Sequence, residues 1–169
     1  MKEKLVKTRY RLSKKDAKKL LNKIEARLGS EILDKLSTFA FVEKVDTRLG
    51  FSIYLFDKKP ILLERKDIIF PTILHADIFR EILPIVVVDM GAVPHIINGA
   101  DVMVPGIREV DKPFNEGTIV LIADEEKLRI FCIGLALMSS REIFSEKRGR
   151  AVKNLHHVKD KIWNLILRL

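Results

Sequence analysis

Cysteine is almost missing from this chain of 169 residues: Cys132 stands alone, so no internal disulfide can form and no CxxC pattern offers zinc ligands. No apolar run approaches the roughly 18–20 residues of a membrane-spanning helix. The lysine-rich N-terminus also lacks the apolar segment of a signal peptide. These absences predict a soluble, cytoplasmic protein. Because Cys132 lies in the apolar run RIFCIGLALM, we expect a buried, inert thiol.

Motifs for catalysis and for nucleotide cofactors are missing too. No Ser/His/Asp or Cys/His pattern occurs in a recognisable context, and there is no GKS or GKT of a P-loop. Gly91, Gly99 and Gly106 are eight and seven residues apart, which is too far for the G-x-G-x-x-G fingerprint. Aromatic residues make up only 7%, and no run resembles a base-stacking RRM motif. We therefore expect no catalytic residues, no metal and no cofactor.

Acidic residues are scarce at one end of the chain only. Residues 1–27 contain 11 Lys and Arg but 3 Asp and Glu, which accounts for the whole formal net charge of +8. Residues 28–70 contain 7 of each kind, and residues 71–169 contain 13 of each. This asymmetry favours contact with a polyanion, either nucleic acid or an anionic surface. A basic helix that only improves solubility explains the charge equally well.

Residues 13–29 form the first predicted helix, with Ser13 as N-cap and Gly29 as its end. One face is an apolar stripe of Ala17, Leu20, Leu21, Ile24 and Leu28. On the polar face a basic ridge recurs every four residues and can meet a phosphate backbone: Lys15, Lys19, Lys23 and Arg27.

The rest of the chain reads as two segments of different character. A short helix is expected at 30–37, then an antiparallel sheet from strands at 40–48, 51–57 and 60–67, then a connector at 68–83 with a helix from Thr72 to Phe79. After Ile85, short strands are expected at 85–89, 100–107, 117–124, 128–138 and 151–158 around one helix at 93–98. Short strands at this spacing predict a small barrel. We expect an α+β protein with domains at 1–83 and 84–169.

The stretch IVVVDMGAVPHIINGADVMVPGI, residues 85–107, resembles a PUA domain, a small RNA-binding barrel. The shared features are VVVD followed by Gly91-Ala92, then Gly99-Ala100-Asp101-Val102 and Pro105-Gly106-Ile107, and later CIGLALMSSREI, KRGRAV and a final strand in NLHHVKDKIW. The resemblance covers residues 84–169. The junction FPTILHADIFREILPIVVVDMGA resembles the malignant-T-cell-amplified-sequence family and ligatin, in which a small α/β pre-PUA domain precedes a PUA pseudo-barrel of short, mostly antiparallel strands.

This resemblance implies binding to structured RNA, linked to tRNA and the small ribosomal subunit, and in eukaryotes a partnership with density-regulated protein. A stand-alone archaeal-type PUA protein is an equally good setting. Carried onto this sequence, the resemblance implies RNA contacts from the helix after the first strand and from the strand that follows: Gly91, Ala92, Val93, His95, Asn98, Gly99, Ala100, Asp101 and Met103. Near the last strand it implies added charge from Arg148, Arg150 and Lys153. The basic ridge would then supply most of the phosphate affinity.

The leading hypothesis is a non-catalytic protein that binds tRNA or rRNA, or the small ribosomal subunit, in translation initiation or recycling. It predicts no DNA and no membrane partner. Two alternatives stay open. The chain can be the RNA-targeting subunit of an enzyme for pseudouridine, archaeosine or methylation chemistry. It can also be an adaptor whose basic helix meets an acidic partner protein.

Overall fold

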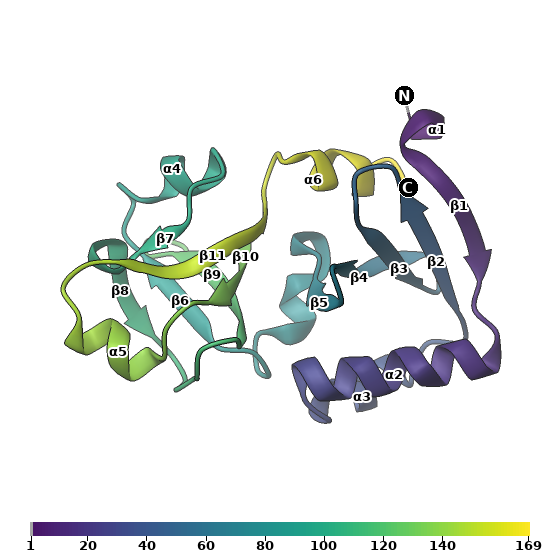
Figure 1. The fold of residues 1–169 in the computed structure, drawn as a ribbon, viewed down its shortest axis with the longest axis horizontal. Coiled ribbons are helices and arrows are strands. Elements are labelled where there is room, and N and C mark those ends of the chain that lie inside the picture. Colours follow the sequence, from purple (N-terminus) through teal and green to yellow (C-terminus); the bar gives the residue numbers. More distant parts are fainter. Residues whose placement is uncertain (1) are drawn as a thin grey trace. The chain divides into compact units, whose positions relative to one another are not determined.

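The computed structural model describes residues 2–169, with side chains from Lys4 onward. The chain divides into two compact units (Figure 1). The first unit runs to Ile82 and also includes Asn164–Leu169, and the second spans Leu83–Trp163. Helices and strands occur in both, so the expected α+β class is confirmed.

The first unit is an antiparallel meander with two helices beside it. The strands follow in the order β1-β2-β3-β4-β5, each pairing with its neighbour in sequence. The helices α2 and α3 lie side by side (Figure 1). The elements are α1 (Lys2–Leu5), β1 (Val6–Arg11), α2 (Lys14–Leu28), α3 (Glu31–Leu36), β2 (Val42–Thr47), β3 (Ser52–Phe56), β4 (Lys59–Arg65), β5 (Ile68–Pro71) and the 3-10 helix η1 (Ile73–Phe79).

Helix α2 begins and ends where the sequence predicts. The Ser13 hydroxyl accepts a hydrogen bond from the Asp16 N–H at 3.1 Å, which satisfies one free donor of the first turn. Gly29 follows with φ at +91°, a conformation that costs glycine little. Three members of the predicted stripe are buried, namely Leu20, Ile24 and Leu28.

The connector predicted at 68–83 was wrong for its first four residues, which form β5. Pro71 made the segment look irregular because proline lacks an N–H. Here Pro71 is the last residue of an edge strand, opposite Leu62, where a ladder donor is not required. Strand β1 was also missed, because its side chains are mostly exposed and carry no apolar alternation.

The second unit is a curled sheet with strand order β7-β11-β10-β9-β6-β8. Only β6 and β9 run parallel. The two strands at the ends of this order, β7 and β8, are separated in sequence by η2 alone, so the sheet must curl to bring its edges together. The elements are β6 (Ile85–Val88), α4 (Val93–Ile97), β7 (Val102–Met103), the 3-10 helix η2 (Val104–Gly106), β8 (Ile107–Val110), β9 (Ile119–Asp124), β10 (Ile130–Ala136), α5 (Ser140–Ser145), β11 (Arg150–His157) and α6 (Lys161–Ile166).

The final strand predicted at 151–158 is confirmed to within one residue at each end. Strand β11 ends at His157, and Lys159 follows with φ at +70°. Asp160 then accepts a hydrogen bond from the Trp163 N–H at 2.7 Å, which starts α6. Helix α5 was missed, although Ser139 and Glu142 form a capping box at its start.

The core of the second unit is mainly aliphatic, with Phe114 and Phe131, and it contains the single cysteine. Cys132 is fully buried, and burial raises the pKa of its thiol well above the usual range. The expectation of a buried thiol is confirmed, and a protonated buried thiol is a poor nucleophile. Nearby on β10, a Cβ atom on Gly134 would overlap the Val152 side chain, so glycine is required where β10 pairs with β11.

Candidate nucleic-acid interface

The short helix α4 is held at both ends by local contacts. At its start, the Asp89 carboxylate accepts a hydrogen bond from the Ala92 N–H at 2.8 Å. A Cβ on Gly106 would approach the Ala92 Cβ to 3.1 Å, so glycine there lets the chain pass close to the helix. At its end, Gly99 has φ at +99°, and its N–H donates to the Ile96 carbonyl at 2.9 Å. These contacts fix the position of one exposed helical turn.

Asn154 of β11 connects α4 to the strand. Its side-chain amide donates to the Ile96 carbonyl at 3.0 Å and to the Ala100 carbonyl at 2.9 Å. Its backbone N–H donates to Asp101 at 2.8 Å. The other oxygen of Asp101 accepts from the Arg150 guanidinium, with Nε at 2.9 Å. The loop after α4 is therefore pinned to β11 by one amide and one carboxylate.

Strand pairing brings Met103 and Arg150 together, whereas Lys153 of β11 lies opposite Leu135 of β10. Met103 of β7 lies opposite Arg150 of β11, and its side chain is 46% exposed. The Gly149 carbonyl accepts from the Val104 N–H at 2.9 Å, which ties the turn that carries Arg148 to η2. We call this surface the α4–β11 face; it consists of Gly91, Ala92, Val93, His95, Asn98, Gly99, Ala100, Asp101, Met103, Arg148, Arg150 and Lys153.

Most of the α4–β11 face is exposed, and Ala92, Val93 and Asp101 are half-buried. The carboxylate of Asp101 is occupied by Arg150 and by the Asn154 N–H, so it shapes the loop rather than offering free charge. Sequence reasoning did not single out Asn154. Strand β11 also contains Arg150, Lys153 and two histidines, so one more polar residue gave no distinct signal.

The basic ridge of α2 consists of Lys15, Lys19, Lys23 and Arg27, and its members are not equivalent. All four are exposed. The Lys23 ammonium lies 2.7 Å from a Glu64 oxygen and 3.9 Å from Asp67. The hydrogen bond to Glu64 raises the pKa of Lys23 against the smaller effect of burial. Within the described residues, Lys15 and Lys19 have no ion pair, so these two keep their full charge for an outside anion.

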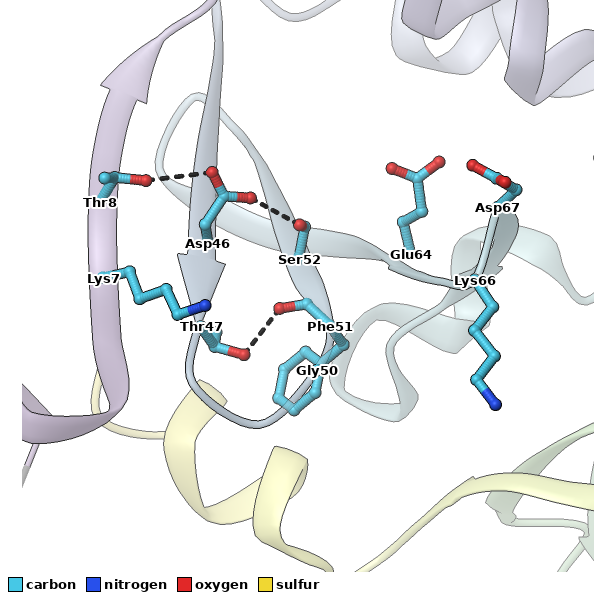
Figure 2. A pocket seen from close by; sticks show the side chains of 10 residues that line it. All are labelled: Lys7, Thr8, Asp46, Thr47, Gly50, Phe51, Ser52, Glu64, Lys66 and Asp67. Carbon is cyan, nitrogen blue, oxygen red and sulfur yellow. Dashed lines mark hydrogen bonds between the residues drawn. The ribbon is translucent and has the colours of Figure 1, made fainter.

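A polar depression of about 480 Å³ lies elsewhere in the first unit, between β1, β2, β3 and the end of β4. Figure 2 shows Asp46 between Thr8 and Ser52, whose hydroxyls donate to it at 3.0 and 2.7 Å. Burial would raise the pKa of Asp46, but these hydrogen bonds and the Lys44 ammonium lower it instead. Glu64 is held by Lys23 and by the Tyr54 hydroxyl. Since Asp46 and Glu64 already have hydrogen-bond and ion-pair partners within the chain, the depression suits structure better than acid–base chemistry.

Three further features bear on the class of site. In the part of the chain that the structure describes, no three His, Cys, Asp or Glu side chains are grouped so as to hold a metal ion. None of the described helices is both long and apolar enough to cross a membrane. Burial and the nearby Lys59 lower the pKa of His75, whose ring lies outside the α4–β11 face.

Two family models match the chain, one in each unit. Residues 84–158 match the PUA domain, and residues 8–76 match a domain of unknown function (DUF1947). The PUA match includes every residue of the α4–β11 face. The second match contains the basic ridge.

Relatives are found in archaea and in eukaryotes. An uncharacterized protein of Methanocaldococcus jannaschii is 40% identical over 94% of this chain and 97% of its own length. Translation machinery-associated protein 20 of Saccharomyces cerevisiae is 30% identical over 79% and 76%. Malignant T-cell-amplified sequence 1 of Rattus norvegicus is 30% identical over 60% and 58%. A crystal structure of a hypothetical protein from Pyrococcus horikoshii matches with a TM-score of 0.81 and 39% identity, over 94% of this chain and 99% of that one.

Proposed function

The chain belongs to the family of PUA-domain proteins that includes translation machinery-associated protein 20 and malignant T-cell-amplified sequence 1, and on this premise we propose that it is a non-catalytic RNA-binding protein of translation. The observation that carries the proposal is the PUA match over residues 84–158, which contains the exposed α4–β11 face. The names of the relatives support a role in translation. The RNA is a structured tRNA or rRNA, met free or on the small ribosomal subunit in the cytoplasm.

The two units contribute in different ways to the proposed binding. Residues 83–163 contain 11 basic and 11 acidic residues, so the second unit has no excess charge to attract a polyanion. Its α4–β11 face offers a fixed helical turn, exposed backbone at Gly99 and Ala100, and two cations, Arg148 and Lys153, besides Arg150, which is paired with Asp101. Such a surface suits recognition of RNA shape and backbone. The first unit supplies long-range attraction through its basic N-terminal segment.

The direct test is binding of tRNA and of purified small ribosomal subunits, measured by filter retention at low salt. Replacing His95 by Ala, and Arg148 and Lys153 by Gln, should weaken tRNA binding about tenfold, because two phosphate partners and one ring are removed. The matched control replaces Lys58 and Lys66 by Gln, which removes the same charge elsewhere. Absence of binding to either RNA target at low salt would overturn the proposal. An equal loss in both variants would show that only net charge matters.

A further inference from the structure

The first unit has an apolar groove that contains no residue of the α4–β11 face or of the basic ridge. It has a volume of about 540 Å³ and lies between α2, α3 and the beginning of β2. Its walls are mainly leucine and phenylalanine side chains. Leu20, Leu36 and Phe56 are buried, whereas Leu21, Phe39 and Phe41 keep part of their surface exposed.

The groove exists because α2 has more apolar surface than the core covers. Leu21 belongs to the predicted apolar stripe, but its side chain is 36% exposed and lines the groove. Phe39 packs on Phe56 with ring centroids 5.7 Å apart. Phe41 is half-buried, and the Arg11 guanidinium lies 4.7 Å from its ring centroid. A partner that covered Leu21, Phe39 and Phe41 would gain free energy by removing their exposed apolar surface from water.

Polar groups in the walls are already satisfied within the chain. The backbone N–H groups of Ala40 and Phe41 both donate to the Asp57 carboxylate, at 2.9 and 3.0 Å. The Ser37 hydroxyl donates to the Asp34 carbonyl at 2.8 Å, and the Ser13 hydroxyl caps α2. A nucleobase buried here would leave its own donors and acceptors unpaired, which costs free energy. The groove therefore favours aliphatic or aromatic side chains.

The charge at the rim selects the kind of segment that brings those side chains. Arg11 and Lys14 lie at the rim, and Asp34 is the one carboxylate among the described residues that line the groove. The rim belongs to the N-terminal segment that carries the whole net charge of +8. A second copy of this chain would bring its own basic α2 against this rim, which like charges oppose.

We propose that this groove binds an acidic amphipathic helix of another protein, which inserts apolar side chains between α2 and β2 and places carboxylates beside Arg11 and Lys14. This is recognition of a helix in a groove, with anchors spaced three and four residues apart. The inference goes beyond RNA binding and does not depend on it. It gives the chain a second surface, so that one protein can hold an RNA and a protein partner.

The experiment uses the full chain and a fluorescein-labelled model peptide of about 17 residues, with leucines at helical spacing and glutamates at the other positions. Fluorescence anisotropy should show saturable binding, about tenfold tighter than for the same peptide with lysines in place of glutamates. Leu21→Gln should weaken binding about fivefold without changing net charge. Lys14→Gln should weaken binding of the glutamate peptide, whereas binding of the lysine peptide should not become weaker. The matched control is Leu74→Gln, in the same unit, 42% exposed and outside the groove.

Three results would overturn the proposal. The first is that the glutamate peptide does not bind the chain, or that it binds the Leu21→Gln and Leu74→Gln variants equally well. The second is that sedimentation shows a dimer that Leu21→Gln abolishes, which assigns the groove to a second copy. The third is that Leu21→Gln removes tRNA binding while peptide binding stays, which assigns the groove to RNA. Since tRNA binding is measured on the same samples, failure of the RNA proposal is seen separately. Should Leu21→Gln not fold, Lys14→Gln still decides the charge requirement.

Discussion

Replacing Lys15 and Lys19 together by glutamine should weaken tRNA binding and reduce its dependence on salt more than replacing Lys23 does. The three side chains project from one helix and are separated by single turns. Lys23 already neutralises Glu64 at 2.7 Å and stands 3.9 Å from Asp67, whereas Lys15 and Lys19 have no ion pair within the described residues. A lysine that already has an intramolecular partner releases fewer counterions from RNA. The free pair should thus account for the larger part of the salt effect.

The size of the effect follows from counterion release. Each phosphate neutralised contributes about 0.7–0.9 to the slope of log K against log salt concentration, so losing two contacts reduces the slope by about 1.4–1.8. Between 50 and 200 mM salt, which is a fourfold change, the wild-type chain should lose about tenfold more affinity than the Lys15/Lys19 variant. Lys23→Gln should change the slope by well under about 0.7, which is the contribution of a single phosphate contact.

The assay is filter retention of labelled tRNA at four or more salt concentrations, with all variants first compared by circular dichroism. Lys58→Gln with Lys66→Gln is the control, since it removes two charges outside the ridge. A slope that is unchanged in the Lys15/Lys19 variant would show that the ridge is only solvated. A larger change from Lys23→Gln than from the pair would refute the reasoning from ion pairing.

Three further predictions concern stability and reactivity of the second unit. Gly134→Ala should destabilise the chain by about 1–3 kcal/mol, because the new methyl overlaps Val152; thermal melting measures it, and an unchanged Tm would contradict the close approach of the two strands at this position. Burial would raise the pKa of Asp160, but hydrogen bonds from His156, Trp163 and His157 lower it, so its contribution to stability is full above about pH 4 and is lost as pH falls through the lowered pKa. Asp160→Asn should therefore lower the Tm at neutral pH and flatten the acid limb of stability against pH; parallel curves would show that the carboxylate does not matter. The Cys132 thiol should not react with Ellman's reagent until the chain is unfolded, and rapid reaction of the native protein would disprove its burial.

Local features of the sequence were enough to predict the elements whose signals are local. Ser13 and Gly29 delimit α2 because caps act within a few residues. The same holds for α4, where Pro94 and Gly99 bracket the helix. The barrel was predicted from the spacing of short strands and from the resemblance of residues 84–169 to PUA domains.

What could not be predicted depends on residues far apart in sequence. Lys23 meets Glu64 across 41 positions, and Asn154 reaches Ile96 across 58. The hydrophobic periodicity around these residues does not indicate which distant residue each of them contacts. Strand β1 escaped notice for a related reason: its side chains are mostly exposed, and its pairing with β2, more than 30 residues later, leaves no trace in its own composition. The RNA contacts of the α4–β11 face stay a prediction.

The strand order of the second unit has a consequence for how the molecule is made. Strand β7 pairs only with β11, so Val102 can pair with Val152 only after fifty more residues have been synthesised. Strand β8, by contrast, can join β6 as soon as both have left the ribosome. The loop beside α4 receives its anchor from Asn154 at the same late moment. A nascent or truncated chain that ends before β11 would thus form most of the barrel but not its α4–β11 face. The proposed RNA binding would therefore begin only when the chain is complete through β11.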